Sequence, residues 1–191
     1  MAIPVSVLQS TSPGSVIELF SIQLNTALHG ANTLYRFHNG ANLNANGEVV
    51  WAGNSYLRFP IDCSGFEFGS TGTLPRPKIS ISNIFGTITA IMQDVNETTV
   101  GNDLNGATFT RIRTLARYLD AANFTGGTNP FGTPDPTAEF PQEIYFLDRK
   151  VTETRDIVTW EAQSALDLIN VKLPQRIATR DIFPGIGAFL G

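Results

Sequence analysis

The residues of this sequence that could most readily do chemistry are one cysteine and two histidines. Cys63 lies in the run DCSG, and His29 and His38 lie upstream of it. A catalytic cysteine needs a base such as histidine, and thiolate and imidazole groups also bind zinc, but none of the three belongs to a close ligand pair. Because Cys63 follows a predicted strand and precedes Phe66 and Phe68, we expect it to pack as a small apolar residue.

Other catalytic signatures have no counterpart here. Ser64 precedes Gly65 without the G-x-S-x-G pattern, and neither a phosphate-binding loop nor a dinucleotide fingerprint occurs. The 17 Asp and Glu residues show no spacing that singles out an acid and a base for glycoside hydrolysis. We therefore predict no catalytic, cofactor-binding or metal-binding residue, and no enzymatic activity.

Three arginines and three large aromatic residues remain as candidates for ligand binding. On a strand, Arg111, Arg113 and Arg117 would share one face, where phosphate binding, ion pairs within an assembly or simple exposure could explain them. A net charge of −4 argues against direct nucleic-acid binding. The aromatic residues could form a sugar-binding platform, although core packing explains them better: Trp51, Tyr56 and Trp160.

These side chains must be positioned mainly by strands. Alternating apolar and polar residues predict strands at residues 17–24, 78–82, 144–152 and 156–162. Residues 107–120 fit either a strand or a helix, and their threonines favour the strand.

The run VVWAGNSYLRFPI predicts a β-hairpin. A two-residue turn at Gly53 and Asn54 would set Trp51 opposite Tyr56, and Val50 opposite Leu57.

The remaining organisation follows from chain length and from proline and glycine content. We expect one β-rich domain over residues 1–191, with no segment apolar enough to insert into a membrane. Four prolines and several glycines predict a long loop at about residues 121–141, mobile in the free chain and ordered against a neighbour. Residues 182–191 form an apolar tail that we expect to dock on a partner.

Several ordered segments resemble the phage minor tail protein L family, typified by lambda-like siphophages. The most specific are W-x-G-x-x-Y at residues 51–56, S-G-F-E at 64–67, R-P-x-x-x-x-S-N at 76–83 and ARYLDAANF at 116–124. With IELFSIQL and LPQR, the resemblance runs over nearly the whole chain.

This resemblance implies a mainly β, barrel-like or sandwich-like tail hub domain with long loops and minor helical content. It also implies a structural protein of the virion tail tip, made in the host cytoplasm and present as a homo-oligomer, expected to be a trimer in a ring. The implied partners are the distal tail or tube-end protein, the central tip attachment (host-specificity) protein and the tape measure protein. The alternatives are a tail-associated cell-wall hydrolase and a glycan-binding β module.

Proteins of this family usually continue into a C-terminal domain whose cysteines bind an iron–sulfur cluster. Here the first such cysteine is expected shortly after Arg180, where Phe183 stands, and Cys63 lies far upstream. A cluster usually requires four thiolates. We therefore expect no cofactor in these 191 residues.

Overall fold

The computed structural model describes residues 7, 9–11, 14–40, 47–67, 74–167, 179, 183 and 185. Its strands are β1 (Val16–Gln23), β2 (Leu34–His38), β3 (Val49–Trp51), β4 (Asn54–Arg58), β5 (Ile61–Ser64), β6 (Lys78–Ser82), β7 (Thr108–Leu115), β8 (Glu143–Glu153) and β9 (Ile157–Gln163). Its α-helices are α2 (Thr26–His29) and α3 (Thr87–Thr98). The mainly β fold with minor helical content is therefore confirmed. Most of the predicted apolar tail, residues 182–191, lies outside the described residues, as does LPQR.

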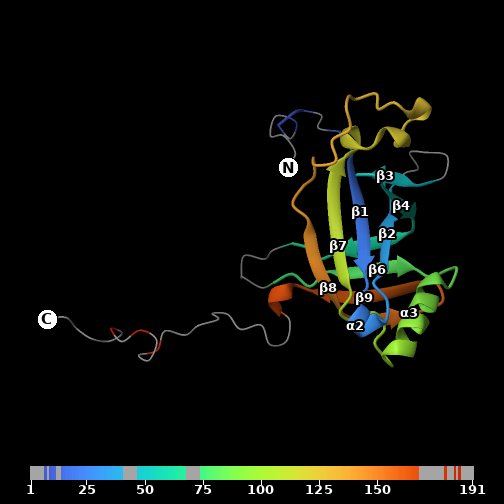
Figure 1. The fold of residues 1–191 in the computed structure, drawn as a ribbon, viewed down its shortest axis with the longest axis vertical. Helices are drawn as coiled ribbons and strands as arrows, with labels where there is room; N and C mark the ends of the chain where they lie inside the picture. Colours follow the sequence, from blue (N-terminus) through green and yellow to red (C-terminus); the bar gives the residue numbers. More distant parts are fainter. Residues whose placement is uncertain are drawn as a thin grey trace.

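The nine strands form one sheet that curls back on itself. Its order is β3-β4-β2-β1-β7-β8-β9-β6-β5, so β4 and β5 lie near opposite ends although only Phe59 and Pro60 separate them. The Phe59 amide donates to His38 O of β2 at 3.0 Å, and Pro60 O accepts from the Ser82 amide of β6 at 2.9 Å. These two linker residues therefore join both ends of the sheet and make it barrel-like. Figure 1 shows the result, with β1 and β7 running lengthwise and β6 and β9 crossing them.

Helix α3 contributes one face to the main hydrophobic cluster. Ile88, Met92 and Val95 recur at helical spacing on one face of α3 and are at most 2% exposed. They pack with inward-facing residues of the sheet, including Phe20, Phe109 and Trp160. This helix was not predicted, although its apolar spacing is visible in the sequence. None of the helices among the described residues is long and apolar enough to cross a membrane.

The four strands predicted from alternation are confirmed with small shifts at their ends, as β1, β6, β8 and β9. The ambiguous segment 107–120 is a strand over Thr108–Leu115 and then turns into a 3-10 helix at Ala116–Tyr118. β7 pairs with β1 along all eight of its residues, which accounts for the preference for strand.

The predicted hairpin exists, but its register was wrong. The turn is formed by Ala52 and Gly53, both with positive φ (50° and 73°), and Val49 rather than Trp51 lies opposite Tyr56. Val49, Trp51 and Tyr56 still share one buried face, because the shift keeps the alternation of the strand. The Gly53 amide donates to Asp120 Oδ2 at 2.7 Å, an interaction that fixes this turn.

The segment predicted as a long loop, residues 121–141, folds over the barrel end that carries this hairpin. It contains 3-10 helices at Ala121–Asn123 and Thr125–Gly127, and Phe124 packs against the hairpin cluster. Asn129 Nδ2 donates to the carbonyls of Arg117 and Leu119, at 2.9 and 3.0 Å. These bonds hold the segment to its own chain, and its mobility in the free chain and ordering against a neighbour remain predictions.

Candidate assembly surface

An exposed apolar turn joins β6 to α3. It comprises residues 83–86, and the Gly86 amide donates to Asn83 O at 2.7 Å, while Gly86 takes a φ of 67°. At its tip Ile84 is 64% exposed and Phe85 is 89% exposed. In Figure 1 the connection from β6 to α3 projects beyond the barrel on its right side. The fold therefore presents an aromatic side chain to the surroundings instead of burying it.

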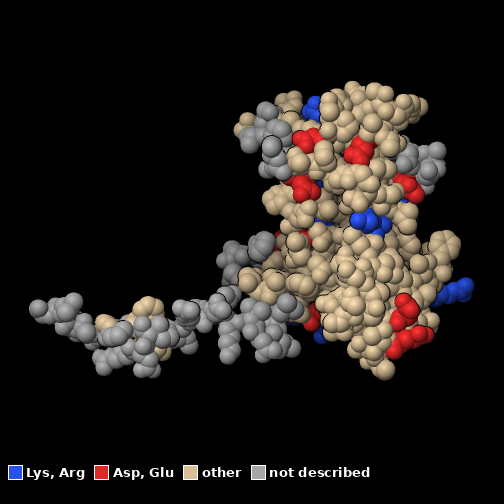
Figure 2. Space-filling model, viewed as in Figure 1, with Lys and Arg blue, Asp and Glu red and all other residues tan. Residues whose placement is uncertain are grey.

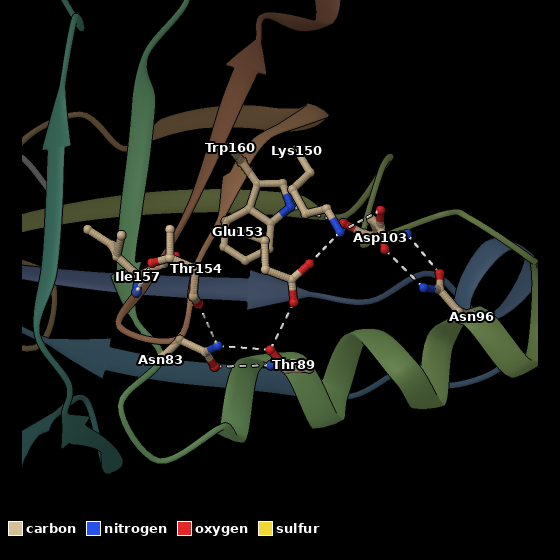
Figure 3. A network of polar contacts seen from close by, with 9 residues as sticks. All are labelled: Asn83, Thr89, Asn96, Asp103, Lys150, Glu153, Thr154, Ile157 and Trp160. Carbon is tan, nitrogen blue, oxygen red and sulfur yellow. Dashed lines mark hydrogen bonds and ion pairs between the residues drawn. The ribbon is translucent and has the colours of Figure 1, made fainter.

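Asn83 holds this apolar turn in place (Figure 3). Its side chain is buried, and its Oδ1 accepts from the Thr89 amide at 3.2 Å, which satisfies a free N–H in the first turn of α3. Its Nδ2 donates to Thr89 Oγ1 at 2.8 Å and to Thr154 O at 3.3 Å, and its amide donates to Asp156 O. Asn83 is the last residue of the R-P-x-x-x-x-S-N run. The apolar turn is thus bonded both to α3 and to the β8–β9 connection.

The network continues from Thr89 to a lysine on β8. Thr89 Oγ1 donates to Glu153 Oε1 at 3.0 Å, and Lys150 Nζ lies 2.6 Å from Glu153 Oε2 and 2.8 Å from Asp103 Oδ2. The hydrogen bond from Lys150 lowers the pKa of both carboxyl groups below their ordinary values. Figure 3 shows Lys150 between the two carboxylates.

At the far end of the network, Asp103 fixes the end of α3. Asn96 Nδ2 donates to Asp103 Oδ1, and the Asp103 amide donates to Asn96 Oδ1, both at 2.9 Å. The indole nitrogen of Trp160 donates to Asp103 O at 3.0 Å, which ties this loop to the core. Both ends of α3 are therefore bonded to the barrel, and the apolar turn rests on a rigid base.

A cavity of about 590 Å³ lies beside the apolar turn, between α3 and the β8–β9 connection. Its lining includes Phe85, Gln93, Glu153 and Arg155. Glu153 is already engaged by Lys150 and Thr89, and the lining offers no nucleophile paired with a base. Its lining therefore supplies no activated nucleophile.

Two of the three arginine candidates form ion pairs within the chain. Arg111 bonds to Glu18 and Glu143, while Arg113 Nη2 lies 2.7 Å from Glu143 Oε1. The Arg111 guanidinium also lies 4.4 Å from the centre of the Phe66 ring, in the S-G-F-E run. The 3-10 helix at Ala116–Tyr118 takes Arg117 off the strand. Arg111 and Arg113 thus pair with carboxylates of their own chain, which differs from the phosphate binding, assembly ion pairs and simple exposure that the sequence suggested.

Cys63 lies on β5, where it is half-buried and packs against the main hydrophobic cluster. Burial raises the pKa of its thiol to about 12, which leaves almost no thiolate near neutral pH. Among the described residues no three potential ligands gather around a possible metal ion. Packing is therefore the role that its surroundings support.

The two histidines hold backbone segments together. The Asn25 amide donates to His29 Nδ1 at 2.8 Å, and His29 Nε2 donates to Asn105 O at 3.1 Å. Likewise the Gly40 amide donates to His38 Nδ1, and His38 Nε2 donates to Gly47 O at 2.9 Å. Burial lowers the pKa of His38, which favours this neutral form. Because both ring nitrogens are engaged, neither histidine is available as a base or a ligand.

Trp51, Tyr56 and Trp160 do not form an exposed platform for a sugar. Trp160 is 0% exposed and lies in the main cluster, whereas Trp51 and Tyr56, at 2% and 4%, lie in the hairpin cluster. The preferred explanation, core packing, is confirmed. The apolar turn was missed, although its adjacent Ile84 and Phe85 between an asparagine and a glycine are a visible signal.

Comparison with known proteins relates this chain to one family and to a phage tail protein. The family model described as phage minor tail protein L matches residues 26–185. Tail tip protein L of Escherichia phage lambda is 39% identical over 93 residues, which make up 48% of this chain and 37% of that protein. The aligned region thus covers little more than a third of the relative.

Proposed function

Because this chain belongs to the phage minor tail protein L family, we propose that it joins the distal end of a siphophage tail tube to the central tip or host-specificity protein. The family match over residues 26–185 carries this proposal, since it supports a structural role in the viral tail. The rigidly held apolar turn adds a surface suited to permanent contacts.

We propose that the protein acts as a homo-oligomer, namely a trimer arranged in a ring. Its neighbours are the distal tail or tube-end protein, the central tip attachment protein and the tape measure protein. Exposed apolar side chains lie at separate places on the chain and could serve different neighbours, among them Phe85 at 89%, Val100 at 93% and Phe131 at 58%. We propose that assembly occurs in the host cytoplasm and that the finished protein resides in the virion tail tip.

We propose that the protein has no enzymatic activity. The family description names a tail protein, and both histidines, the bases considered for Cys63, use their ring nitrogens in hydrogen bonds with backbone groups. A cell-wall clearing assay with purified protein distinguishes this proposal from a tail-associated hydrolase. No clearing is expected, and clearing lost on mutation of an acidic residue would contradict the proposal.

The residues present do not fit an iron–sulfur cluster. The sequence holds one cysteine, whose thiol is held protonated by burial, and both histidines use both ring nitrogens in hydrogen bonds. We propose that residues 1–191 bind no cluster. Stoichiometric iron and sulfide in the purified chain would contradict this.

Complementation tests the proposed function. A phage lacking this gene should form no complete tails, and the chain supplied in trans should restore infectious particles. A variant with Asn83→Ala should restore fewer, because its apolar turn is no longer fixed. Normal tails without the protein would contradict an essential role in joining the tube to the tip.

A further inference from the structure

We propose that neighbouring copies bind head to tail, with the apolar turn of one copy seated in a second cavity of the next copy, beside the first residues of β8. This inference rests on the proposed ring and names the surfaces that form it. The second cavity, called here the β8 cavity, is lined by residues 74, 75, 113, 141–145 and 164.

The β8 cavity has the size and character to hold an aromatic side chain. Its volume is about 380 Å³, and an apolar cavity of about 150 Å³ already suffices to hold benzene. Leu74, Pro75, Pro141 and Ile144 supply an apolar lining, and Ile144 is 53% exposed. An aromatic side chain entering here would remove apolar surface of both partners from water.

The charged groups of the β8 cavity neutralise each other. Arg113 Nη2 lies 2.7 Å from Glu143 Oε1, and both side chains belong to the lining. An apolar side chain can therefore enter without leaving an unpaired charge buried. The apolar turn is suited to this site because its exposed tip, Ile84 and Phe85, carries no charge.

The turn and the cavity lie near opposite ends of β8. Residues 143–145, at its start, line the cavity, whereas Glu153, at its other end, lies beside the turn. In Figure 1, the β6–α3 connection projects on the right of the barrel. A contact between two different surfaces of identical chains is heterologous, and it generates a ring when the rotation between copies closes. The turn and the cavity are different surfaces, so their contact is heterologous, whereas a twofold dimer would pair the same surface of both copies.

The base of the turn supports a role as an anchor. Aromatic residues held rigid before binding lose little conformational entropy, and a few such residues carry most of the energy of an interface. Asn83 and Thr89 provide this rigidity. The tip is smaller than the roughly 800 Å² per partner that a stable interface buries, so surrounding residues must complete the contact.

Disulfide trapping in the full chain tests the contact directly. A variant with both Ile84→Cys and Ile144→Cys keeps Phe85, and it should form covalent oligomers under mild oxidation, whereas each single variant should not. The single variants also control for Cys63. Cross-linking of the Ile84→Cys variant alone would reveal a turn-to-turn dimer and overturn the proposal. So would a folded double variant that stays monomeric.

Complementary disruption gives a second test by native mass spectrometry. Phe85→Asp places a charge on the turn but leaves the β8 cavity intact. Ile144→Arg blocks the β8 cavity but leaves the turn intact. Neither variant should therefore assemble alone. Their mixture should form one-to-one dimers through the remaining intact pair, whereas Leu57→Asp, at an exposed apolar residue of β4, should assemble like the original chain. Failure of the mixture to pair, with both variants folded, would overturn the contact.

The failure of this inference is distinguishable from that of the proposed function. If labelled protein is found at the tail tip but no trapped oligomers form, the contact is wrong and the tail-tip role stands. If the protein is absent from the tip, the proposed function fails whatever the trapping shows.

Discussion

Asn123 pairs with the main chain of Val50 as a neighbouring strand would. The Val50 amide donates to Asn123 Oδ1 at 2.7 Å, and Asn123 Nδ2 donates to Val50 O at 2.6 Å. β3 is the terminal strand of the sheet, so one side chain satisfies a backbone edge that would otherwise be free to pair. With the bond from Gly53 to Asp120, it joins ARYLDAANF to the hairpin of W-x-G-x-x-Y. Two segments quoted separately for the family resemblance therefore form one structural unit.

Replacing Asn123 by Ala should destabilise the protein by about 2–3 kcal/mol, because its side chain forms three hydrogen bonds, to Val50 N, Val50 O and Asp120 O, and these half-buried groups would lose a partner. Urea unfolding followed by fluorescence measures the change. Asn123→Asp keeps the acceptor for the Val50 amide but sets a carboxylate oxygen against the carbonyls of Val50 and Asp120, so it should also destabilise the protein. Equal stability of the Ala variant and the original protein would show that the pairing does not support the edge.

Replacing Trp51 by Ala should cost about 3–5 kcal/mol, because its indole is 2% exposed in the hairpin cluster. Leu57 on β4 is 54% exposed and offers a matched control, for which Ala should cost less than about 0.5 kcal/mol. Thermal and urea unfolding of both variants compare the two sites. A loss below about 1 kcal/mol for Trp51 would contradict its burial.

The contacts of Lys150 with Glu153 and Asp103 should stabilise the protein less at acidic pH. Lys150 lowers the folded-state pKa values of Asp103 and Glu153 below their ordinary 3.8 and 4.5. The unfolded chain therefore binds more protons in this range, so the stabilisation is present above the ordinary values and is lost as pH falls through the lowered ones.

Unfolding titrations between neutral pH and about pH 2 measure this dependence. With Lys150→Met, the free energy of unfolding should decrease less as the pH falls. Lys78→Met, at an exposed position of β6, should leave this pH dependence unchanged. Identical pH profiles for the original protein and the Lys150 variant would show that Lys150 does not hold these carboxylates.

The Cys63 thiol should be unreactive in the folded protein. With a folded-state pKa of about 12 against an ordinary 9.0, its thiolate population at pH 8 falls by a factor on the order of a thousand. Alkylation by iodoacetamide should therefore be slow in buffer and fast in denaturant, as measured by mass spectrometry. Comparable rates in the two conditions would refute the burial of this thiol.

The strands could be predicted because alternation is a local pattern. Ile79 and Ile81 alternate with polar residues and are fully buried on β6, as their spacing indicates. The hairpin register could not be predicted, because Ala52 adopts a positive φ that usually favours glycine or asparagine. In the same turn, the Gly53 amide bonds to Asp120, which lies far away in the sequence, so the local sequence does not reveal this contact.

The candidate site could be predicted even less. Asn83 donates a hydrogen bond to Thr154 O, and Thr89 donates one to Glu153. Both contacts form only when β8 and β9 are in place. Sequence periodicity reports which face of an element is buried, but not which polar groups meet across the fold.

Labelling the protein in the assembled particle tests the central claim most directly. Gold particles bound to a peptide tag on this chain, observed by electron microscopy of purified virions, should lie at the end of the tail remote from the capsid. Tagged capsid and tail-tube proteins provide the controls for labelling elsewhere. Gold along the tube, on the capsid or absent from infectious virions that retain an accessible tag would contradict a structural role in the tail tip.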